Sequence, residues 1–158
     1  GVRPDVMSSA KGLGGGFPIG ACLATAEAAK GITAGTHGST FGGNPLATAV
    51  SNAVLDVILA PGFLPHVVEM SNLLNVELKA VAERHPAVIK EVRGEGLLLG
   101  MKCVVPNADL AAKAFDHGLL TVLAGDNVMR FLPPLIIHET HIGEAIAILE
   151  ECCEELEG

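Results

Sequence analysis

Two glycine-rich segments near the start of the sequence set the strongest limit on how this chain folds. The first, at 12–16 (GLGGG), lies between apolar segments at 6–7 and 19–24. The second, at 36–43, ends at an Asn-Pro pair at 44–45, an N-cap residue followed by proline at the first helical position. Clustered glycines permit tight turns and close backbone approach. The sequence therefore predicts short strands and loops up to this point, and a helix after it.

Hydrophobic periodicity predicts three long helices in the rest of the chain. The first should bury one apolar stripe before Pro61-Gly62 ends it. The second should end at His85-Pro86, and the third should close the sequence. The expected buried residues are Leu46, Ala49, Val50, Ala53, Val54, Val57 and Ile58 in the first, Leu64, Val67, Leu74, Leu78 and Val81 in the second, and Ile142, Ala145, Ile146, Leu149, Cys153 and Leu156 in the third.

The segment between the second and third helices has the pattern of a small sheet. Strands are expected at 87–93, 97–105, 119–123 and 128–132, with a short helix over 108–117 and a turn at 125–127 (Gly-Asp-Asn). This organisation predicts two unequal parts. Residues 1–50 should be strands and loops of a larger α/β domain, and residues 51–158 should be a compact α+β unit with its own core. The boundary should lie inside the first long helix.

Composition excludes several classes of partner. The 158 residues carry a formal net charge of −8, and the ten Lys and Arg residues are scattered, which argues against nucleic acid. Hydrophobic residues make up 49% of the chain, yet no run approaches the roughly 18 apolar residues of a membrane helix. Surplus hydrophobicity without a membrane span predicts apolar surfaces that another chain, or a further part of this one, would cover.

The cysteines and the first residues bear on location. Cys22, Cys103, Cys152 and Cys153 have no CxxC spacing and no regular framework, which is typical of a reducing compartment, here the cytoplasm. The sequence opens on Gly1 without an initiator methionine. We therefore expect an N-terminal portion to precede it, and such a portion would contain any targeting segment.

Lys11 is a candidate catalytic residue. It follows a strand, has small neighbours, and precedes the first glycine-rich segment, so backbone and ligand could both approach its amine. A lysine in such a place can lose its proton and form an imine with an aldehyde. The alternative is a solvated lysine beside a flexible loop.

The glycine-rich segments do not fit nucleotide motifs. A dinucleotide-binding loop would need glycine at 12, 14 and 17, but Phe17 occupies the last position, and no Gly-Lys-Ser or Gly-Lys-Thr is present. Ser39 and Thr40, between glycines and just before a helix, suit a dianionic phosphate. A simple turn and capping role is the alternative.

Arg130 and a histidine pair complete the candidates. Arg130 lies in an apolar strand, so its guanidinium should pair either with a substrate carboxylate or with an acid of the protein. His138 and His141 lie one residue short of the HExxH spacing and lack a third ligand. They indicate a helix start, and no metal site is expected.

Four segments, taken together, resemble the class III aminotransferases, a branch of the fold-type I pyridoxal-phosphate-dependent enzymes. They are 3–21 (RPDVMSSAKGLGGGFPIGA), 36–47 (THGSTFGGNPLA), 92–97 (VRGEGL) and 130–135 (RFLPPL), in family order. The second is most similar to acetylornithine aminotransferases, with ornithine, succinylornithine and 4-aminobutyrate aminotransferases as relatives. The resemblance implies an α/β fold, made of a fragment of the large domain and the small α+β C-terminal domain.

The resemblance also implies roles for the candidate residues. Lys11 would hold pyridoxal 5′-phosphate covalently and, once freed, move a proton during transamination of N-acetylornithine with 2-oxoglutarate in arginine biosynthesis. Ser39 and Thr40 would bind the cofactor's phosphate in the neighbouring subunit of a homodimer. Arg130 would bind a substrate carboxylate or pair with an acid in the empty site.

The resemblance is incomplete in a way that matters for activity. Family members are about two and a half times longer, and the remaining half carries a first phosphate loop, a stacking aromatic ring and the aspartate that protonates the pyridine nitrogen. Asp5 belongs to the Arg-Pro-Asp segment and does not take that role. The chain alone is therefore expected to be inactive. The alternatives are another donor specificity (ornithine, succinylornithine or 4-aminobutyrate) or a non-catalytic remnant that self-associates.

Overall fold

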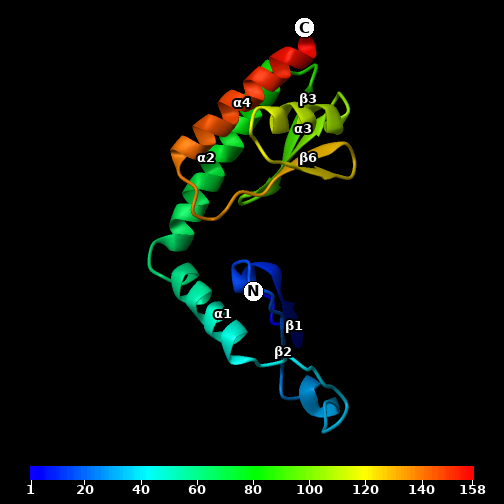
Figure 1. Ribbon diagram of the computed structural model, residues 1–158, viewed down its shortest axis with the longest axis vertical. Helices are drawn as coiled ribbons and strands as arrows, with labels where there is room; N and C mark the ends of the chain where they lie inside the picture. Colours follow the sequence, from blue (N-terminus) through cyan, green and yellow to red (C-terminus); the bar gives the residue numbers. More distant parts are fainter. The chain divides into compact units, whose positions relative to one another are not determined.

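A computed structural model describes all residues, 1–158, and divides them into two compact units (Figure 1). The first unit comprises Gly1–Phe63 and the second Leu64–Gly158. This division places the whole of the first long helix in the first unit.

The first unit contains a hairpin and one long helix. Strands β1 (Val6–Ser9) and β2 (Ala21–Ala24) pair antiparallel, with Ser9 opposite Ala21. The short 3₁₀ helix η1 (Lys11–Gly14) lies in their connection, a second one, η2 (Ala28–Gly31), follows β2, and α1 (Pro45–Ile58) ends the unit. Both strands and the helix lie where the sequence predicts them.

Helix α1 begins as its sequence predicts, but the face it buries matches the predicted stripe only in part. The Asn44 side chain accepts a hydrogen bond from the Ala47 backbone at 2.9 Å, which satisfies one of the free N–H groups of the first turn. The buried residues of α1 are Ala47 and Ser51, whereas the predicted stripe residues Leu46 and Val57 are 62% and 54% exposed. The predicted stripe is therefore confirmed only in part: Val50, Val54 and Ile58 are half-buried, but the most buried positions are the small residues Ala47 and Ser51, which the stripe did not include.

The second unit is a four-stranded antiparallel sheet with three helices. Its elements are α2 (Phe63–Arg84), β3 (Ile89–Glu95), β4 (Leu98–Cys103), α3 (Asn107–Asp116), β5 (Val122–Ala124), β6 (Val128–Phe131) and α4 (Glu139–Glu157). The strand order is β3-β4-β6-β5, and every neighbouring pair is antiparallel. Helices α2 and α4 lie side by side along the unit (Figure 1). These elements agree with the sequence prediction to within a few residues.

The core of the second unit is continuous and almost entirely apolar. Leu78 and Val81 of α2, Met101 of β4, Met129 of β6 and Leu149 of α4 are fully buried in it. Of the predicted stripe of α2, Leu64 is 50% exposed and the rest turns inward. Each fully buried large apolar side chain contributes about 1.5–3 kcal/mol to the free energy of unfolding. This core therefore makes the second unit the stable part of the chain.

Two turns in the sheet need special backbone conformations. Asp126 and Asn127 have φ values of 61° and 55° in the β5–β6 turn, where Asn and Asp are favoured because they tolerate the left-handed region. The Asn127 amide donates to the carbonyls of Cys103 and Val105, both at 2.8 Å. Gly94 has a φ of 130°, and a Cβ added there would lie 2.2 Å from the Leu98 oxygen.

A buried histidine joins the ends of α2 and α4. His85, 7% exposed, contacts Glu150 through Nε2 at 2.8 Å and Glu157 through Nδ1 at 3.0 Å. Arg84 also pairs with Glu150. Burial by itself disfavours the charged ring, but the hydrogen bonds to Glu157 and Glu150 outweigh it and raise the pKa of His85. The same cluster, through Arg84 first, lowers the pKa of Glu150.

All four cysteines are free thiols, and they differ in accessibility. Cys22 of β2 is exposed, whereas Cys103, Cys152 and Cys153 are buried in the second unit. Burial raises the pKa of Cys153 to about 12.

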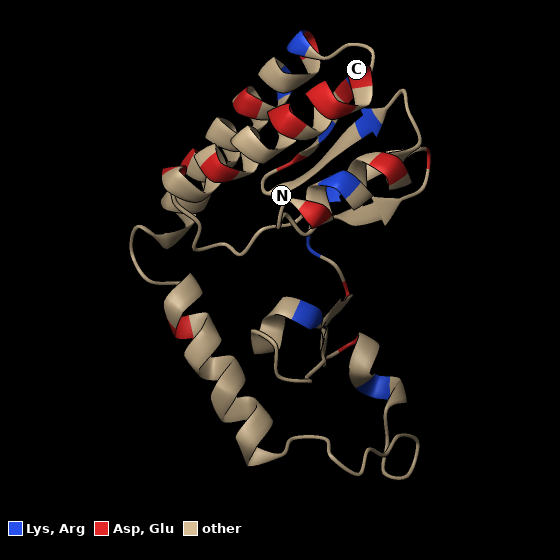
Figure 2. Ribbon diagram, turned by 45° about the horizontal axis from the view of Figure 1, so that its top comes forward, with Lys and Arg blue, Asp and Glu red and all other residues tan.

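Charge is unevenly distributed along the helices. Figure 2 shows α4 with a series of acidic residues, in contrast to α1, which has Asp56 alone. No helix by itself is long and apolar enough to cross a membrane; α1 and α2 meet that test only when counted as a pair.

Candidate active site

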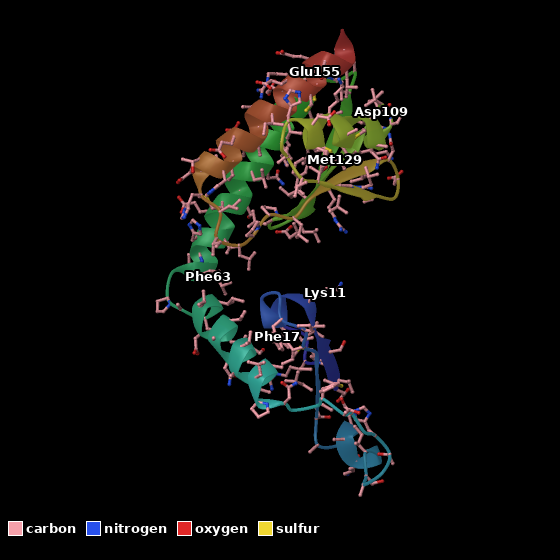
Figure 3. The ribbon with its side chains drawn as sticks, in the orientation of Figure 1. Lys11, Phe17, Phe63, Asp109, Met129 and Glu155 are labelled. Carbon is pink, nitrogen blue, oxygen red and sulfur yellow. The ribbon has the colours of Figure 1, made fainter.

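Lys11 lies where the β1–β2 hairpin turns, and it has an unusual backbone conformation. Its φ of 54° is in the left-handed region, which non-glycine residues rarely adopt. Figure 3 shows its side chain projecting from the loop that also carries Phe17. The side chain is exposed, and Lys11 takes part in none of the chain's ion pairs. Its amine is therefore free of any carboxylate and open to a ligand.

Close packing explains two glycines of the loop after Lys11. A Cβ on Gly14 would lie 2.8 Å from Cγ2 of Ile19, and one on Gly15 would lie 2.8 Å from Cγ2 of Val54. Gly15 also has a φ of 55°. The close approach predicted from these glycines is therefore an approach to neighbouring side chains of the protein. Nothing lies within 4 Å of a Cβ on Gly12, so that position leaves open space beside Lys11.

Ser39 and Thr40 lie in an exposed turn that leads into α1. The Ser39 carbonyl accepts a bond from the Gly42 backbone at 3.4 Å, and the Asn44 amide donates to the Phe41 carbonyl at 2.9 Å. Within the chain, the hydroxyls and the backbone N–H groups of Ser39 and Thr40 form no hydrogen bonds. The turn thus presents unpartnered donors to an anion, and no hydrogen bond joins it to Lys11.

Arg130 belongs to the second unit and lines a cavity of about 570 Å³. It lies in β6, opposite Gly100 of β4 and Val122 of β5. Its Nε is buried without a hydrogen-bond partner, and Arg130 forms no ion pair. No acid of this chain pairs with it. The other walls of the cavity are mostly apolar, which strengthens the attraction of this guanidinium for a carboxylate.

The histidines of the near-HExxH segment start a helix, as predicted. His138 is the N-cap of α4, and its backbone N–H donates to Nδ1 of His141 at 3.0 Å. No group of three or more His, Cys, Asp and Glu side chains is arranged to hold a metal ion.

Sequence reasoning missed two groups near these candidates. Ser51 of α1 is 6% exposed and donates to the Leu13 carbonyl at 2.9 Å, 38 residues away. The Thr121 hydroxyl lines the same cavity as Arg130 and is buried without a partner. Neither carries a local signal, because an isolated serine in a helix and threonine beside a strand are ordinary.

The family assignment follows from comparison with known proteins. Residues 1–153 match the model of the family described as aminotransferase class-III. The chain belongs to the class III aminotransferases. It is 63% identical over 153 residues to acetylornithine aminotransferase 1 of Bradyrhizobium diazoefficiens, covering 97% of this chain and 38% of that protein.

Solved aminotransferase structures share the fold. An acetylornithine aminotransferase of Elizabethkingia anophelis is 34% identical with a TM-score of 0.89, over 98% of this chain and 42% of that one. An ornithine aminotransferase of Toxoplasma gondii, described as holding PLP at partial occupancy in its active site, is 31% identical with a TM-score of 0.90, over 99% and 38%. The chain therefore spans about two fifths of each relative. The predicted family and fold class, that of the C-terminal part of such an enzyme, are confirmed.

Proposed function

We propose that the protein carrying this chain is a pyridoxal-phosphate-dependent aminotransferase that transfers an amino group between N-acetylornithine and 2-oxoglutarate. Lys11 carries this proposal: its amine is exposed and unpaired at the turn of the hairpin, in a chain of the aminotransferase family. The donor is inferred from the similarity to proteins named acetylornithine aminotransferase, at 63% and 56% identity.

The residues of the first unit fit the cofactor chemically. Lys11 offers a free amine to an aldehyde, and Ser39 and Thr40 offer unpartnered hydroxyls and N–H groups to a phosphate dianion. When bound, pyridoxal phosphate acts as an electron sink for the carbanion formed at the substrate's α-carbon. The protein's part is to hold, orient and exchange protons.

Lys11 would then have two tasks. Its Nζ holds the cofactor between turnovers, and once released it takes the proton from the α-carbon of the amino-acid substrate as a general base. Its amine forms no ion pair within the chain, so no carboxylate of the chain competes for it.

Arg130 would bind a substrate carboxylate. Its buried Nε–H has no hydrogen-bond partner, so a ligand oxygen can accept from it. The planar guanidinium can donate two parallel hydrogen bonds to a carboxylate. The apolar cavity walls would exclude water from that pair and fix the orientation of the bound acid.

The remaining parts of the proposal concern assembly and location. We propose a homodimer in which Ser39 and Thr40 serve the neighbouring subunit's cofactor, acting in cytoplasmic arginine biosynthesis. Exposed apolar residues of the first unit, among them Phe41 at 80% and Leu46 at 62%, support an interface there. Ornithine remains a second candidate donor, since solved ornithine aminotransferases share the fold at 30–32% identity.

The experiment that tests the proposal is a spectrum with added pyridoxal phosphate, followed by borohydride reduction and peptide mapping. An adduct on Lys11 is expected, and Lys11→Ala should remove the visible band. Lys30→Ala is the matched control, since Lys30 is an exposed lysine of the same unit that pairs with Glu27. A band that survives Lys11→Ala would reject Lys11 as the cofactor lysine.

The non-catalytic alternative makes a different prediction. A self-associating remnant should give no specific adduct on Lys11, yet should sediment as an oligomer through its exposed apolar residues. A monomer without the adduct would argue against both readings. Activity of the chain alone is not expected, because the resemblance assigns other essential cofactor contacts to residues outside it.

A further inference from the structure

Helix α1 is bonded to both candidate loops of the first unit. Ser51 Oγ donates to the carbonyl of Leu13, in the loop that begins at Lys11, at 2.9 Å. At the start of the same helix, the Asn44 amide donates to the Phe41 carbonyl, in the turn of Ser39 and Thr40, at 2.9 Å. One helix therefore connects two loops that no direct hydrogen bond joins.

We propose that Ser51 is a positioning residue for Lys11, and this rests on the proposed role of Lys11 as the cofactor lysine. The Leu13 carbonyl accepts no other hydrogen bond, so Ser51 alone satisfies it. Leu13 lies two residues after Lys11, inside the same 3₁₀ turn. A tie at Leu13 therefore restrains the backbone from which the Lys11 side chain extends.

The backbone of Lys11 needs such a restraint. A φ of 54° is costly for a residue with a Cβ and persists only where the surroundings impose it. The loop's own bonds, from Leu13 N to Ala10 O, from Gly15 N to Gly12 O and from Phe17 N to Gly14 O, each close a single turn. Beyond the paired strands β1 and β2 on either side, α1 is what holds the loop.

Two contacts of α1 make this attachment, and only one is directional. Val54 lies one turn after Ser51 on the same helix face and abuts Gly15, where a Cβ would come within 2.8 Å. That contact limits how closely the loop approaches but not how it is rotated. The Ser51 hydrogen bond requires a particular orientation of the Leu13 carbonyl, and this sets the direction of the 3₁₀ turn and of Lys11.

The test compares Ser51→Ala with Ser71→Ala. Ser71 is also a buried helical serine, 8% exposed, but its hydroxyl donates to Val68 of its own helix at 3.0 Å. Both variants lose one hydroxyl, and only Ser51→Ala releases the Lys11 loop. The measurements are amide hydrogen exchange at Leu13, Gly15 and Phe17, and the ratio of pyridoxal-phosphate adducts on Lys11 and Lys30 after borohydride reduction.

Ser51→Ala should accelerate exchange at the three loop amides by about fivefold to tenfold, the factor that loss of one hydrogen bond produces. The ratio of Lys11 to Lys30 adduct should fall by a similar factor. Ser71→Ala should change neither quantity. A merely structural serine would instead speed exchange throughout the first unit and leave the adduct ratio as it was, because both lysines belong to that unit.

The outcomes separate this inference from the proposed function. Unchanged loop exchange in Ser51→Ala, or an unchanged adduct ratio, overturns the positioning role while Lys11 keeps its proposed role. Equal labelling of Lys11 and Lys30 in the unsubstituted protein overturns the role of Lys11 and the inference together.

Discussion

Replacement of His85 by Gln should destabilise the second unit in a pH-dependent way. The His85 side chain is 8% exposed and contacts two carboxylates, Glu150 and Glu157, whose side chains are 24% and 32% exposed. A hydrogen bond to a charged group contributes about 1.5–3 kcal/mol. Partial exposure of the carboxylates screens both bonds, and Gln can retain one of them. We therefore expect His85→Gln to lower the free energy of unfolding by about 2 kcal/mol at about pH 6.

The sign of the pH effect follows from the raised pKa of His85. A group whose pKa is higher in the folded state than in the unfolded state stabilises the folded state fully at pH values below its unfolded-state pKa, which is about 6.5 for histidine. This stabilisation is lost as pH rises through the folded-state pKa. Neutral imidazole has one N–H, so only one carboxylate keeps its bond. At about pH 9 the loss in His85→Gln should therefore be much smaller than at about pH 6, because Gln and the neutral imidazole each keep one bond.

The assay is urea unfolding of the chain and its variants, followed by far-UV circular dichroism because the chain has no Trp or Tyr. His66→Gln is the control, because His66 Nε2 contacts the neutral carbonyl of Ile137 at 2.8 Å and no carboxylate. An equal loss for His85→Gln at the two pH values, or none, would refute the reasoning.

Three further substitutions have expected outcomes. Asn127→Gly keeps the positive φ but loses the bonds to two carbonyls, so it should cost about 2 kcal/mol in urea unfolding. Gly94→Ala should cost about 3 kcal/mol or more, or prevent folding, because its Cβ would overlap the Leu98 oxygen; retained solubility with an unchanged unfolding midpoint would contradict this. In the longer protein that carries this chain, Arg130→Lys should raise the KM for 2-oxoglutarate by about 30-fold, since the bidentate fork is lost. It should leave the unfolding midpoint unchanged, because Arg130 has no ion pair to lose.

Local signals predicted most of the fold. The Asn44-Pro45 pair located the start of α1, and Gly125-Asp126-Asn127 located the β5–β6 turn, because each depends on the conformational preference of the residues themselves. The buried face of α1 was predicted only in part, for the opposite reason. Periodicity identifies apolar positions, but the actual neighbour is a glycine loop that fits Ala47 and Ser51 better than Leu46.

The sequence predicted which residues belong to the candidate site but not the contacts they make. Lys11, Ser39 and Thr40 were found from their glycine-rich surroundings, and their roles stay predictions. The Ser51–Leu13 bond spans 38 residues, and His85 meets carboxylates 65 and 72 residues away. No pattern in the sequence links positions so distant. The chemistry of Arg130 indicated a carboxylate partner. The sequence could not show whether that partner is an acid of this chain, and the structure shows none paired with it.

Because the cysteines differ in accessibility, their reaction with a thiol reagent can report separately on the two units. Cys22 is exposed on the hairpin that carries Lys11, whereas the other three thiols are inside the second unit. A thiol reagent should therefore add one mass increment at once, and three more only as the second unit opens. A series of mass spectra would give the rate at which that unit opens. A spin label on Cys22 would report on the hairpin, and neither experiment requires a substitution.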